Sequence, residues 1–424
     1  MSRTAFAIAR EELPNGVVLL GQQRPTSRAV LLRASMRAGA LGEPREVAGR
    51  ARLTGSMLTR GTDRYDFAAL NQCTDSNGIA LSSDAGRHTI DLSLRCLADD
   101  VPLAIDLLAE LLLHPTFPSD QLERLRGEVL NGLREAENDT RSVADRAFRE
   151  AAYPGGHPFG QRIGGYVDSV ERISRDEIAR YHLESFAPDR LTIVIVGGTE
   201  IDAGFAGLGR VFAAWRPKGD SGRRTIADAV PPERPQRITR VLDGKSQVDI
   251  VVGRPTIGRM HPDFYALDVG NLILGRLGLN GRIGANVRER LGLAYYSYSE
   301  LEGGHGPGAW AARAGVNPAN AERAIEAIIA EVRAICQTGI LESERADAAN
   351  FLTGVLPLAL DSNDGVARTI QSIDTFDLGL DYVERYPTII RGLTGEQIHD
   401  ALRRHLDAER NIISLAGPEM SHGN

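Results

Sequence analysis

Alternating apolar and polar residues mark several strands in the first part of the chain. A turn signal at Asn15–Gly16 precedes the apolar run Val17–Leu20, and a second run covers Ala29–Met36. We expect these two runs to pair as an opening hairpin. In Thr89–Cys96 the apolar residues fall on every second position, which predicts a half-buried strand. Ile79–Ser83 is predicted to be its antiparallel neighbour.

Apolar residues three or four positions apart predict helices between and after these strands. The expected helices cover Val47–Leu58, Tyr65–Cys73, Asp100–Leu113, Ser119–Glu137, Ser142–Ala152 and Ser174–Ser185. Asp100 and Ser119 are residue types that favour N-cap positions. A continuous apolar run at Leu191–Val196, ended by Gly197–Gly198, predicts a buried strand after the last of these helices.

Residues 216–236 interrupt this order, since they hold four prolines among charged residues and show no periodicity. They are predicted to be a linker. Beyond them the chain repeats its first part at an offset of 220 residues. The repeated residues are Ile178 with Ile398, Arg190 with Arg410, Gly197 with Gly417, Ala104 with Ala324, and Ile105 with Ile325.

A duplicated unit of about 210 residues accounts for this spacing. We therefore predict an N-terminal domain in residues 1–215 and a C-terminal domain in residues 237–424. The expected fold class is α+β, with two homologous halves. Each half is expected to be an antiparallel-rich mixed sheet with helices packed on one face.

The composition is that of a globular chain without a membrane span. Of the 424 residues 42% are hydrophobic and 25% are charged, and no apolar run reaches the roughly 18 residues that a membrane helix needs. The net charge of -7 offers nucleic acid no basic surface. Three cysteines without a C-x-x-C spacing argue against a disulfide framework and a thiolate metal site. Met1–Arg10 has no apolar signal segment, so we expect a cytoplasmic protein, or a periplasmic one if the N-terminus has been trimmed.

One stretch in the second half, Asn280–Tyr296, combines a helix end, a glycine stop at Gly292 and a strand. Arg288 and Tyr295 flank this turn. Together they could hold a carbonyl oxygen or an oxyanion, the guanidinium by its charge and the phenol by one directed hydrogen bond. Alternatively, Arg288 interacts with the helix dipole at a surface helix end and Tyr295 lies in a core strand. The stretch by itself leaves both interpretations open.

Several motifs, in their order and spacing, resemble those of the pitrilysin/insulinase zinc metallopeptidases. The resemblance is greatest to the short heterodimeric bacterial type related to mitochondrial processing peptidase. The matching segments, which extend over almost the whole chain, are Pro14–Val18, Gly39–Pro44, Met57–Thr62, His157–Gly160 with Gly164, Tyr265–Gly275, Arg288–Glu289 and Gly292–Tyr295. The resemblance implies a duplicated LuxS/metallopeptidase-like fold and the cleavage of peptides or small proteins.

In active members of this family a helix carries H-x-x-E-H, in which the histidines bind zinc and the glutamate acts as a base, and a second helix adds a glutamate ligand. Alignment on Gly49 and Gly61–Thr62 places these four residues at Arg52, Gly55, Ser56 and near Gly132. An arginine is a fixed cation, glycine has no side-chain ligand, and a lone serine hydroxyl is a poor one. None of the nine histidines restores the H-x-x-E-H spacing elsewhere. We expect no zinc and no other cofactor in this chain.

The resemblance assigns roles to other residues as well. Arg288 and Tyr295 coincide with the arginine and tyrosine that reach the scissile carbonyl in this family. Gly275, Gly278 and Gly281 lie where the noncatalytic subunit of mitochondrial processing peptidase has a glycine-rich substrate loop. The same three glycines equally suit a plain helix-to-helix turn.

Two further segments of the N-terminal half match known features of the family. Ile79–Ser82 matches the edge strand to which active members add a peptide substrate. His157 is expected to be a structural loop histidine.

Two functions are consistent with these features. In the first, this chain is the noncatalytic subunit of a heterodimeric zinc metallopeptidase, is inactive alone, and supplies Arg288 and Tyr295 to the substrate carbonyl. A partner subunit then carries H-x-x-E-H and the zinc. In the second, the chain is a noncatalytic peptide-binding or structural protein, like the core subunits of respiratory complexes related to this family. The presence of both Arg288 and Tyr295 favours the first function. Neither function involves nucleic acid or a membrane.

Overall fold

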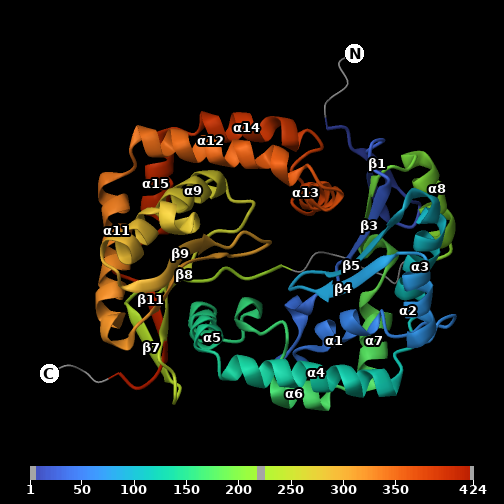
Figure 1. The fold of residues 1–424 in the computed structure, drawn as a ribbon, viewed down its shortest axis with the longest axis horizontal. Helices are drawn as coiled ribbons and strands as arrows, with labels where there is room; N and C mark the ends of the chain where they lie inside the picture. Colours follow the sequence, from blue (N-terminus) through green and yellow to red (C-terminus); the bar gives the residue numbers. More distant parts are fainter. Residues whose placement is uncertain (1–5, 217–224, 421–424) are drawn as a thin grey trace. The chain divides into compact units, whose positions relative to one another are not determined.

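The computed structural model describes residues 6–216 and 225–420 (Figure 1). They form two compact units. Of the described residues, unit 1 contains 6–133, 161–216 and 356–383, and unit 2 contains 134–160, 225–355 and 384–420. Each unit thus holds one segment that lies in the other half of the sequence, which the predicted ranges 1–215 and 237–424 do not include. One of the points where the chain passes between the units, after residue 224, falls inside the predicted linker 216–236, of which residues 217–224 lie outside the described residues.

A six-stranded sheet forms the centre of unit 1, in the order β1-β2-β6-β3-β5-β4. Its strands are β1 (Ala9–Glu12), β2 (Val18–Gln23), β3 (Ala29–Met36), β4 (Ala80–Ala85), β5 (Ile90–Leu97) and β6 (Leu191–Gly197). β2 and β6 are parallel, and the other neighbours are antiparallel. β6 is buried along its whole length, as its continuous apolar run predicts.

The predicted hairpin between Val17–Leu20 and Ala29–Met36 is wrong, because β6 lies between β2 and β3. The turn at Asn15–Gly16 instead joins β1 to β2. Local alternation identifies strands but does not say which distant strand inserts between them. The predicted pair of Thr89–Cys96 and Ile79–Ser83 is confirmed by β5 and β4, with β4 at the edge of the sheet.

The helices of unit 1 are α1 (Arg50–Met57), α2 (Phe67–Ser76), α3 (Val101–Leu113), most of α4 (Ser119–Glu137), α6 (Val167–Arg172), α7 (Arg175–Ser185), α8 (Ile201–Phe212) and α13 (Asn363–Thr375). Five of these, α1, α2, α3, α4 and α7, overlap the predicted helical segments, whereas α6, α8 and α13 do not correspond to any predicted helix. α1 begins later than the predicted Val47, because Ala48 is extended and Gly49 has a φ of 98°. Only glycine adopts such a φ without strain.

The core of unit 1 lies on both faces of its sheet. Leu19, Leu32 and Ile195 face the larger cluster, which α1, α3, α7 and α8 complete. Leu31 and Val194 face the opposite side, where Val366, Ala367 and Ile370 of α13 cover them.

Unit 2 contains a five-stranded sheet in the order β7-β11-β8-β10-β9. Its strands are β7 (Gln236–Val241), β8 (Val248–Pro255), β9 (Ala294–Leu301), β10 (Ala309–Val316) and β11 (Ile412–Gly417). The order repeats that of β2-β6-β3-β5-β4, and β7 and β11 form the one parallel pair, as β2 and β6 do. The duplication inferred from the offset of 220 residues is therefore visible in the topology, and the α+β fold class with two related halves is confirmed.

The helices of unit 2 complete the same pattern. They are α5 (Thr140–Ala152), α9 (Phe264–Asn271), α10 (Arg282–Gly284), α11 (Ala321–Thr338), most of α12 (Glu342–Ala359), most of α14 (Tyr382–Gly392) and α15 (Gly395–His405). Two π-helical segments, η6 (Leu272–Arg276) and η8 (Ala285–Arg290), precede β9. Ile398 of α15 and Ile178 of α7 are both fully buried, as their equivalent places in the repeat require.

Helices α5 and α13 occupy equivalent places in the two sequence halves but pack in the opposite units. α5 comes from the first half and packs on β8 and β11 of unit 2. α13 comes from the second half and packs on β3 and β6 of unit 1. Each sheet is therefore completed by a helix that the other half of the sequence encodes.

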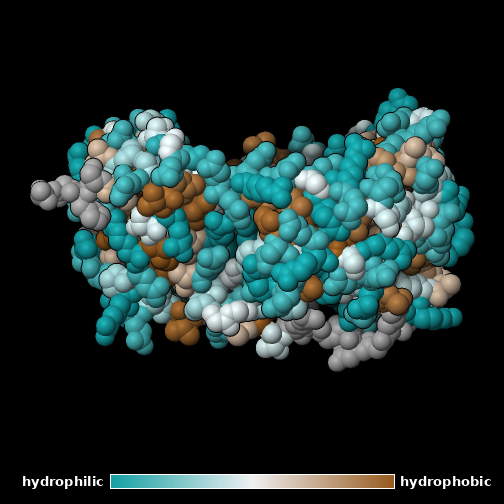
Figure 2. Space-filling model, turned by 90° about the horizontal axis from the view of Figure 1, so that it is seen from below, coloured by the Kyte–Doolittle hydropathy of each residue, from teal (hydrophilic) through white to brown (hydrophobic). Residues whose placement is uncertain are grey.

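Among the described residues, every helix is too short or too polar to cross a lipid bilayer. The face drawn in Figure 2 is mainly hydrophilic, and its apolar residues gather in small separate groups.

The three cysteines are free, and burial raises the pKa of the Cys96 and Cys336 thiols to about 11. Such thiols are poor nucleophiles.

Candidate functional site

Helix α1, which the resemblance aligns with the zinc-binding helix of the family, is anchored at its start by a buried acid. Glu43 is 7% exposed and accepts hydrogen bonds from the backbone N–H groups of Gly49 at 3.0 Å and Ala51 at 2.6 Å. A carboxylate at a helix N-terminus satisfies donors that have no partner within the helix. Burial is the dominant influence on Glu43 and raises its pKa to about 7.

Arg52, at the position of the first histidine, lies on the exposed side of α1. A guanidinium nitrogen of Arg52 is 3.6 Å from a carboxylate oxygen of Asp84 on β4. Both side chains are largely exposed, so this ion pair contributes little to stability. Arg52 places a permanent positive charge where a metal ligand would have to supply a lone pair.

Gly55 and Ser56, at the positions of the glutamate and the second histidine, offer no better ligands. A Cβ at Gly55 would lie 3.2 Å from Ile90 and 3.3 Å from Ala85, so α1 packs tightly on β4 and β5 there. The Gly55 carbonyl accepts a hydrogen bond from the Ser83 hydroxyl at 2.7 Å. Gly132, at the position of the distal ligand, lies on α4 with open space around it. This set of side chains does not fit a zinc ion.

Arg288 and Tyr295 lie in two irregular elements of unit 2. Arg288 is in the last turn of the π-helical segment η8, and Gly292, with a φ of 61°, ends that segment as predicted. Tyr295 is the extra residue of a β-bulge, because Tyr296 pairs with Gly315 and Ala294 pairs with Val316. π-Helical turns and bulges are frequent at functional sites, where they redirect side chains.

Both side chains are available to a ligand. Tyr295 is 64% exposed, which rules out the alternative that it lies in the core. The Arg288 side chain is 42% exposed, and its one ion-pair contact in the described part of the chain is Glu289 at 4.0 Å. Neither side chain forms a hydrogen bond with any residue that the structure describes. A guanidinium and a phenol in this state can donate to a carbonyl oxygen without first giving up a partner.

The three glycines upstream differ in their surroundings. A Cβ at Gly275 would lie 2.6 Å from the Ser299 hydroxyl, and one at Gly281 would lie 2.6 Å from the Cα of Gly275, so both allow close packing of backbone. Gly278 has a φ of 57° and open space around it. Gly275 and Gly281 thus serve a compact turn, and Gly278 alone leaves room for a ligand.

The two other family features of the first half have clear surroundings. β4, which contains Ser82, is an edge strand of the sheet in unit 1 and alternates between exposed and half-buried residues. The Nε2 atom of His157 is 2.9 Å from the Ala227 carbonyl, and its Nδ1 atom accepts from the Phe159 N–H at 3.1 Å. One ring nitrogen has its partner within the loop and the other has its partner in the segment before β7, as expected for a structural histidine.

Sequence reasoning missed two features of unit 2. The bulge that exposes Tyr295 depends on pairing with β10 and has no signal in the strand itself. His261, Asp263 and His405 lie together although they are far apart in the sequence. Spacing rules for metal motifs could not have paired them.

Comparison with known proteins agrees with the predicted resemblance. Residues 18–163 match the family described as insulinase, peptidase family M16, and residues 172–352 match the peptidase M16 inactive domain. An uncharacterised zinc protease of Mycobacterium tuberculosis is 27% identical over 424 aligned residues, which cover 99% of this chain and 94% of the relative. The beta subunit of the mitochondrial-processing peptidase of Pongo abelii is 24% identical over 401 residues, which cover 90% of this chain and 78% of that subunit.

A solved structure shows the same relationship in three dimensions. The crystal structure of a peptidase M16 inactive domain from Pseudomonas fluorescens has a TM-score of 0.90 and 25% identity, and the match covers 98% of this chain and 99% of that one. Both halves of the sequence and the whole of the fold are thus accounted for by one family. The chain belongs to peptidase family M16, the insulinase family.

Proposed function

We propose that this chain is the noncatalytic subunit of a heterodimeric zinc metallopeptidase that cleaves peptides or small proteins. The observation that carries the proposal is a contrast within the chain. Arg288 and Tyr295 are exposed and without hydrogen-bond partners among the described residues, whereas Arg52, Gly55 and Ser56 on α1 provide no metal ligands. A second subunit with an intact H-x-x-E-H helix would then hold the zinc, and this chain would be inactive alone.

The role proposed for the pair follows from the charge that develops during peptide cleavage. When a peptide carbonyl is attacked, its oxygen gains negative charge, and donors aimed at that oxygen stabilise the transition state more than the ground state. Arg288 would give a charge-assisted hydrogen bond and Tyr295 a neutral one. Gly278, the most open of the three upstream glycines, would let a peptide approach the backbone beside this pair.

The test is a peptide-cleavage assay on complexes reconstituted from this chain and its H-x-x-E-H partner. Removal of one oxyanion donor commonly costs about 10²–10³ in rate. We expect Arg288→Ala and Tyr295→Phe each to lower kcat/KM by roughly tenfold or more. This lower bound is smaller than the usual cost because the two donors stabilise the same oxyanion, and their effects are not additive. Assembly, followed by size, and the zinc content of the partner should not change.

Two matched control variants, one in η8 and one in β9, distinguish a catalytic role of Arg288 and Tyr295 from a general disturbance of these two elements. Arg290→Ala removes a neighbouring arginine of η8 that is bonded to Asn286, and Tyr298→Phe removes a hydroxyl of the same strand that accepts from Arg141. Both should retain most of the activity. Unchanged rates in Arg288→Ala and Tyr295→Phe would instead favour a noncatalytic peptide-binding or structural protein in which the pair merely persists.

A further inference from the structure

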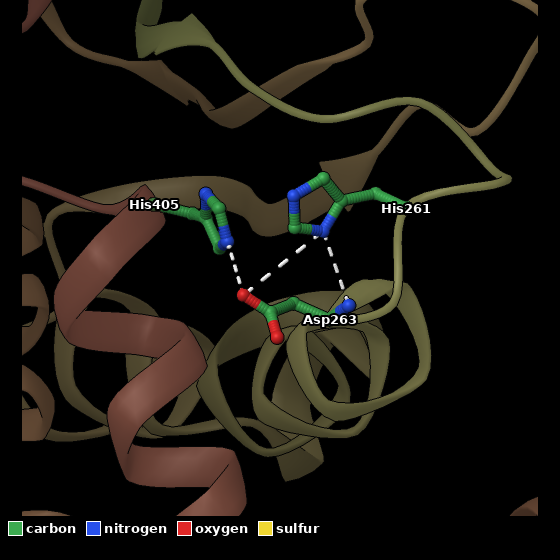
Figure 3. A group of neighbouring side chains, drawn as sticks. All are labelled: His261, Asp263 and His405. Atoms are coloured by element: carbon green, nitrogen blue, oxygen red, sulfur yellow. Dashed lines mark hydrogen bonds and ion pairs between the residues drawn. The ribbon is translucent and has the colours of Figure 1, made fainter.

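Unit 2 contains a cluster of two imidazoles and one carboxylate that lies outside the site described above (Figure 3). His261 lies in the turn before α9, Asp263 is the residue at the N-cap of α9, and His405 is the last residue of α15. The packing of α9 on α15 brings them together. Within the described residues this is the one group of at least three histidine, cysteine or acidic side chains with converging ligand atoms.

The carboxylate of Asp263 does not cap helix α9, although Asp263 is at its N-cap position. An aspartate at an N-cap commonly accepts from the first backbone N–H groups of its helix. Here the carboxylate makes no such bond. Its Oδ2 atom is 2.8 Å from Nε2 of His405 and 4.0 Å from Nδ1 of His261, as Figure 3 shows. The carboxylate is therefore directed at the two imidazoles.

The distances suit a small divalent ion. The three ligand atoms lie within 4.8 Å of one another. Ligands at about 2.0–2.2 Å from a tetrahedral zinc ion are about 3.4 Å apart. The cluster would reach that spacing by side-chain shifts of about 1 Å or less. A metal would take the place of the proton that now joins His405 to Asp263, and it would displace the Asp263 backbone N–H, from which Nδ1 of His261 now accepts a hydrogen bond at 3.1 Å.

The surroundings leave a coordination position open. His261 and His405 line a cavity of about 570 Å³, whose wall also includes Arg254, Thr256 and His305. The buried Nε atom of Arg254 and the buried hydroxyl of Thr256 have no hydrogen-bond partner within the described residues. Water or an anion could therefore occupy this cavity and accept hydrogen bonds from these donors.

The local charges both favour and oppose a cation. His405 ends α15, and the C-terminal end of a helix attracts positive charge. Arg404 competes for the same carboxylate, because its guanidinium is 3.1 Å from Oδ1 of Asp263. The Arg404 side chain is 58% exposed, so it can turn into solvent when a metal binds.

We propose that His261, Asp263 and His405 form a binding site for a divalent transition metal, with zinc as the best match to two imidazoles and one carboxylate. Three protein ligands with a fourth position toward a cavity are typical of zinc sites that bind an exchangeable ligand. This site goes beyond the proposed function, since it is independent of α1 and of the Arg288 and Tyr295 pair. It places a metal where the sequence predicted none.

The test uses the full chain, freed of metal with a chelator and titrated with Zn²⁺ by calorimetry and with Co²⁺ by its visible absorption. We expect one ion per chain. His261→Ala, His405→Ala and Asp263→Asn should each weaken binding by about tenfold or more. Arg404→Gln should strengthen it, because the competing cation is gone. His114→Ala is the matched control, since His114 has one carboxylate near it, Asp63 at 3.8 Å, and should bind as the unaltered chain does.

Folding of each variant is checked by its circular dichroism spectrum, and Asp263→Asn preserves shape if an alanine variant unfolds. Absence of binding by the folded chain would overturn the proposal. Binding that survives in all three ligand variants, or that is lost in Ser56→Ala on α1, would also overturn it. None of these results depends on peptide cleavage, so the site and the proposed function can fail separately.

Discussion

Single residues decide what helix α1 can do. At the three positions that the resemblance aligns with two zinc-binding histidines and a catalytic base, this helix has a cation at Arg52, no side chain at Gly55 and a hydroxyl at Ser56. Glu43 remains as a buried acid at the start of the helix, where it bonds the backbone rather than a metal. The helix is therefore retained as a structural element, and the energetics of these positions can be tested individually.

Glu43 predicts a pH dependence of stability. Burial raises its pKa in the folded chain to about 7 from the ordinary value of 4.5, so between these pH values the folded state holds more protons than the unfolded state. Its contribution to stability is then fully present below about pH 4.5 and is lost as the pH rises through 7. The loss is on the order of 3 kcal/mol.

Urea unfolding of the whole chain at pH 5 and at pH 8 measures this effect. Glu43→Gln cannot ionise, so its free energy of unfolding should fall less over this range than that of the unaltered chain. An equal fall in both proteins would show that Glu43 does not titrate in the way predicted.

The two helix glycines that the resemblance aligns with glutamates of the family, Gly55 and Gly132, should respond differently to alanine. Glycine within a helix costs about 0.5–1 kcal/mol relative to alanine, because it loses more backbone freedom on folding. Gly132→Ala on α4 meets nothing and should raise the free energy of unfolding by about that amount. Gly55→Ala should gain less, because its Cβ would press on Ile90 at 3.2 Å and Ala85 at 3.3 Å. Equal denaturation midpoints for the two variants would contradict this.

At the scale of elements, the packing contact between α5 and the sheet of unit 2 contains a buried polar group, Asp249. Asp249 of β8 is 2% exposed and accepts from the hydroxyls of Thr140 and Tyr296 and from the side-chain amide of Gln247. Thr140 is the first residue of α5. A buried carboxylate with these donors fixes where the helix begins on the sheet.

Thr140→Val keeps the shape of this side chain but removes one donor from the buried carboxylate. We expect a loss of about 1–3 kcal/mol in the free energy of unfolding. The control is Thr338→Val on α11, whose hydroxyl bonds only the Ala334 carbonyl of its own helix. It should change stability by less than about 0.5 kcal/mol. Similar losses of unfolding free energy in both variants would mean that the hydrogen bond from Thr140 to Asp249 contributes nothing beyond the change in helix propensity.

At the scale of the whole molecule, the duplication is completed by an exchange of helices. Each sheet has the same strand order, and each is covered on one side by a helix from the other half of the sequence. In unit 1, α13 covers Leu20, Leu31 and Val194. The two halves of the sequence therefore repeat the same strand order, but they are not independent folding units.

A chain of residues 1–224 alone should not fold stably, because it lacks α13 and leaves an apolar face of its sheet uncovered. We expect aggregation or strong binding of a hydrophobic dye. Co-expression with residues 225–424 should restore a soluble complex, since that fragment carries the missing helix. A soluble, cooperatively unfolding 1–224 fragment would show that the exchange is dispensable.

The sequence by itself determined most of the elements of the N-terminal half and the duplication. Helical and alternating patterns located α3, α4 and β5, because burial of one face imposes a local period, and a continuous apolar run located the fully buried β6. The offset of 220 residues predicted the duplication. The residue types at Arg52, Gly55 and Ser56 lead to the expectation that these positions bind no zinc, since they offer no good ligand atom.

Only the tertiary structure decided which of these elements meet. It placed β6 between β2 and β3, sent α5 and α13 to opposite units, and exposed Tyr295 through a bulge. It also joined His261 to His405. A local pattern records which side of an element is buried but not which distant element buries it, since that choice depends on pairing and packing across the whole chain.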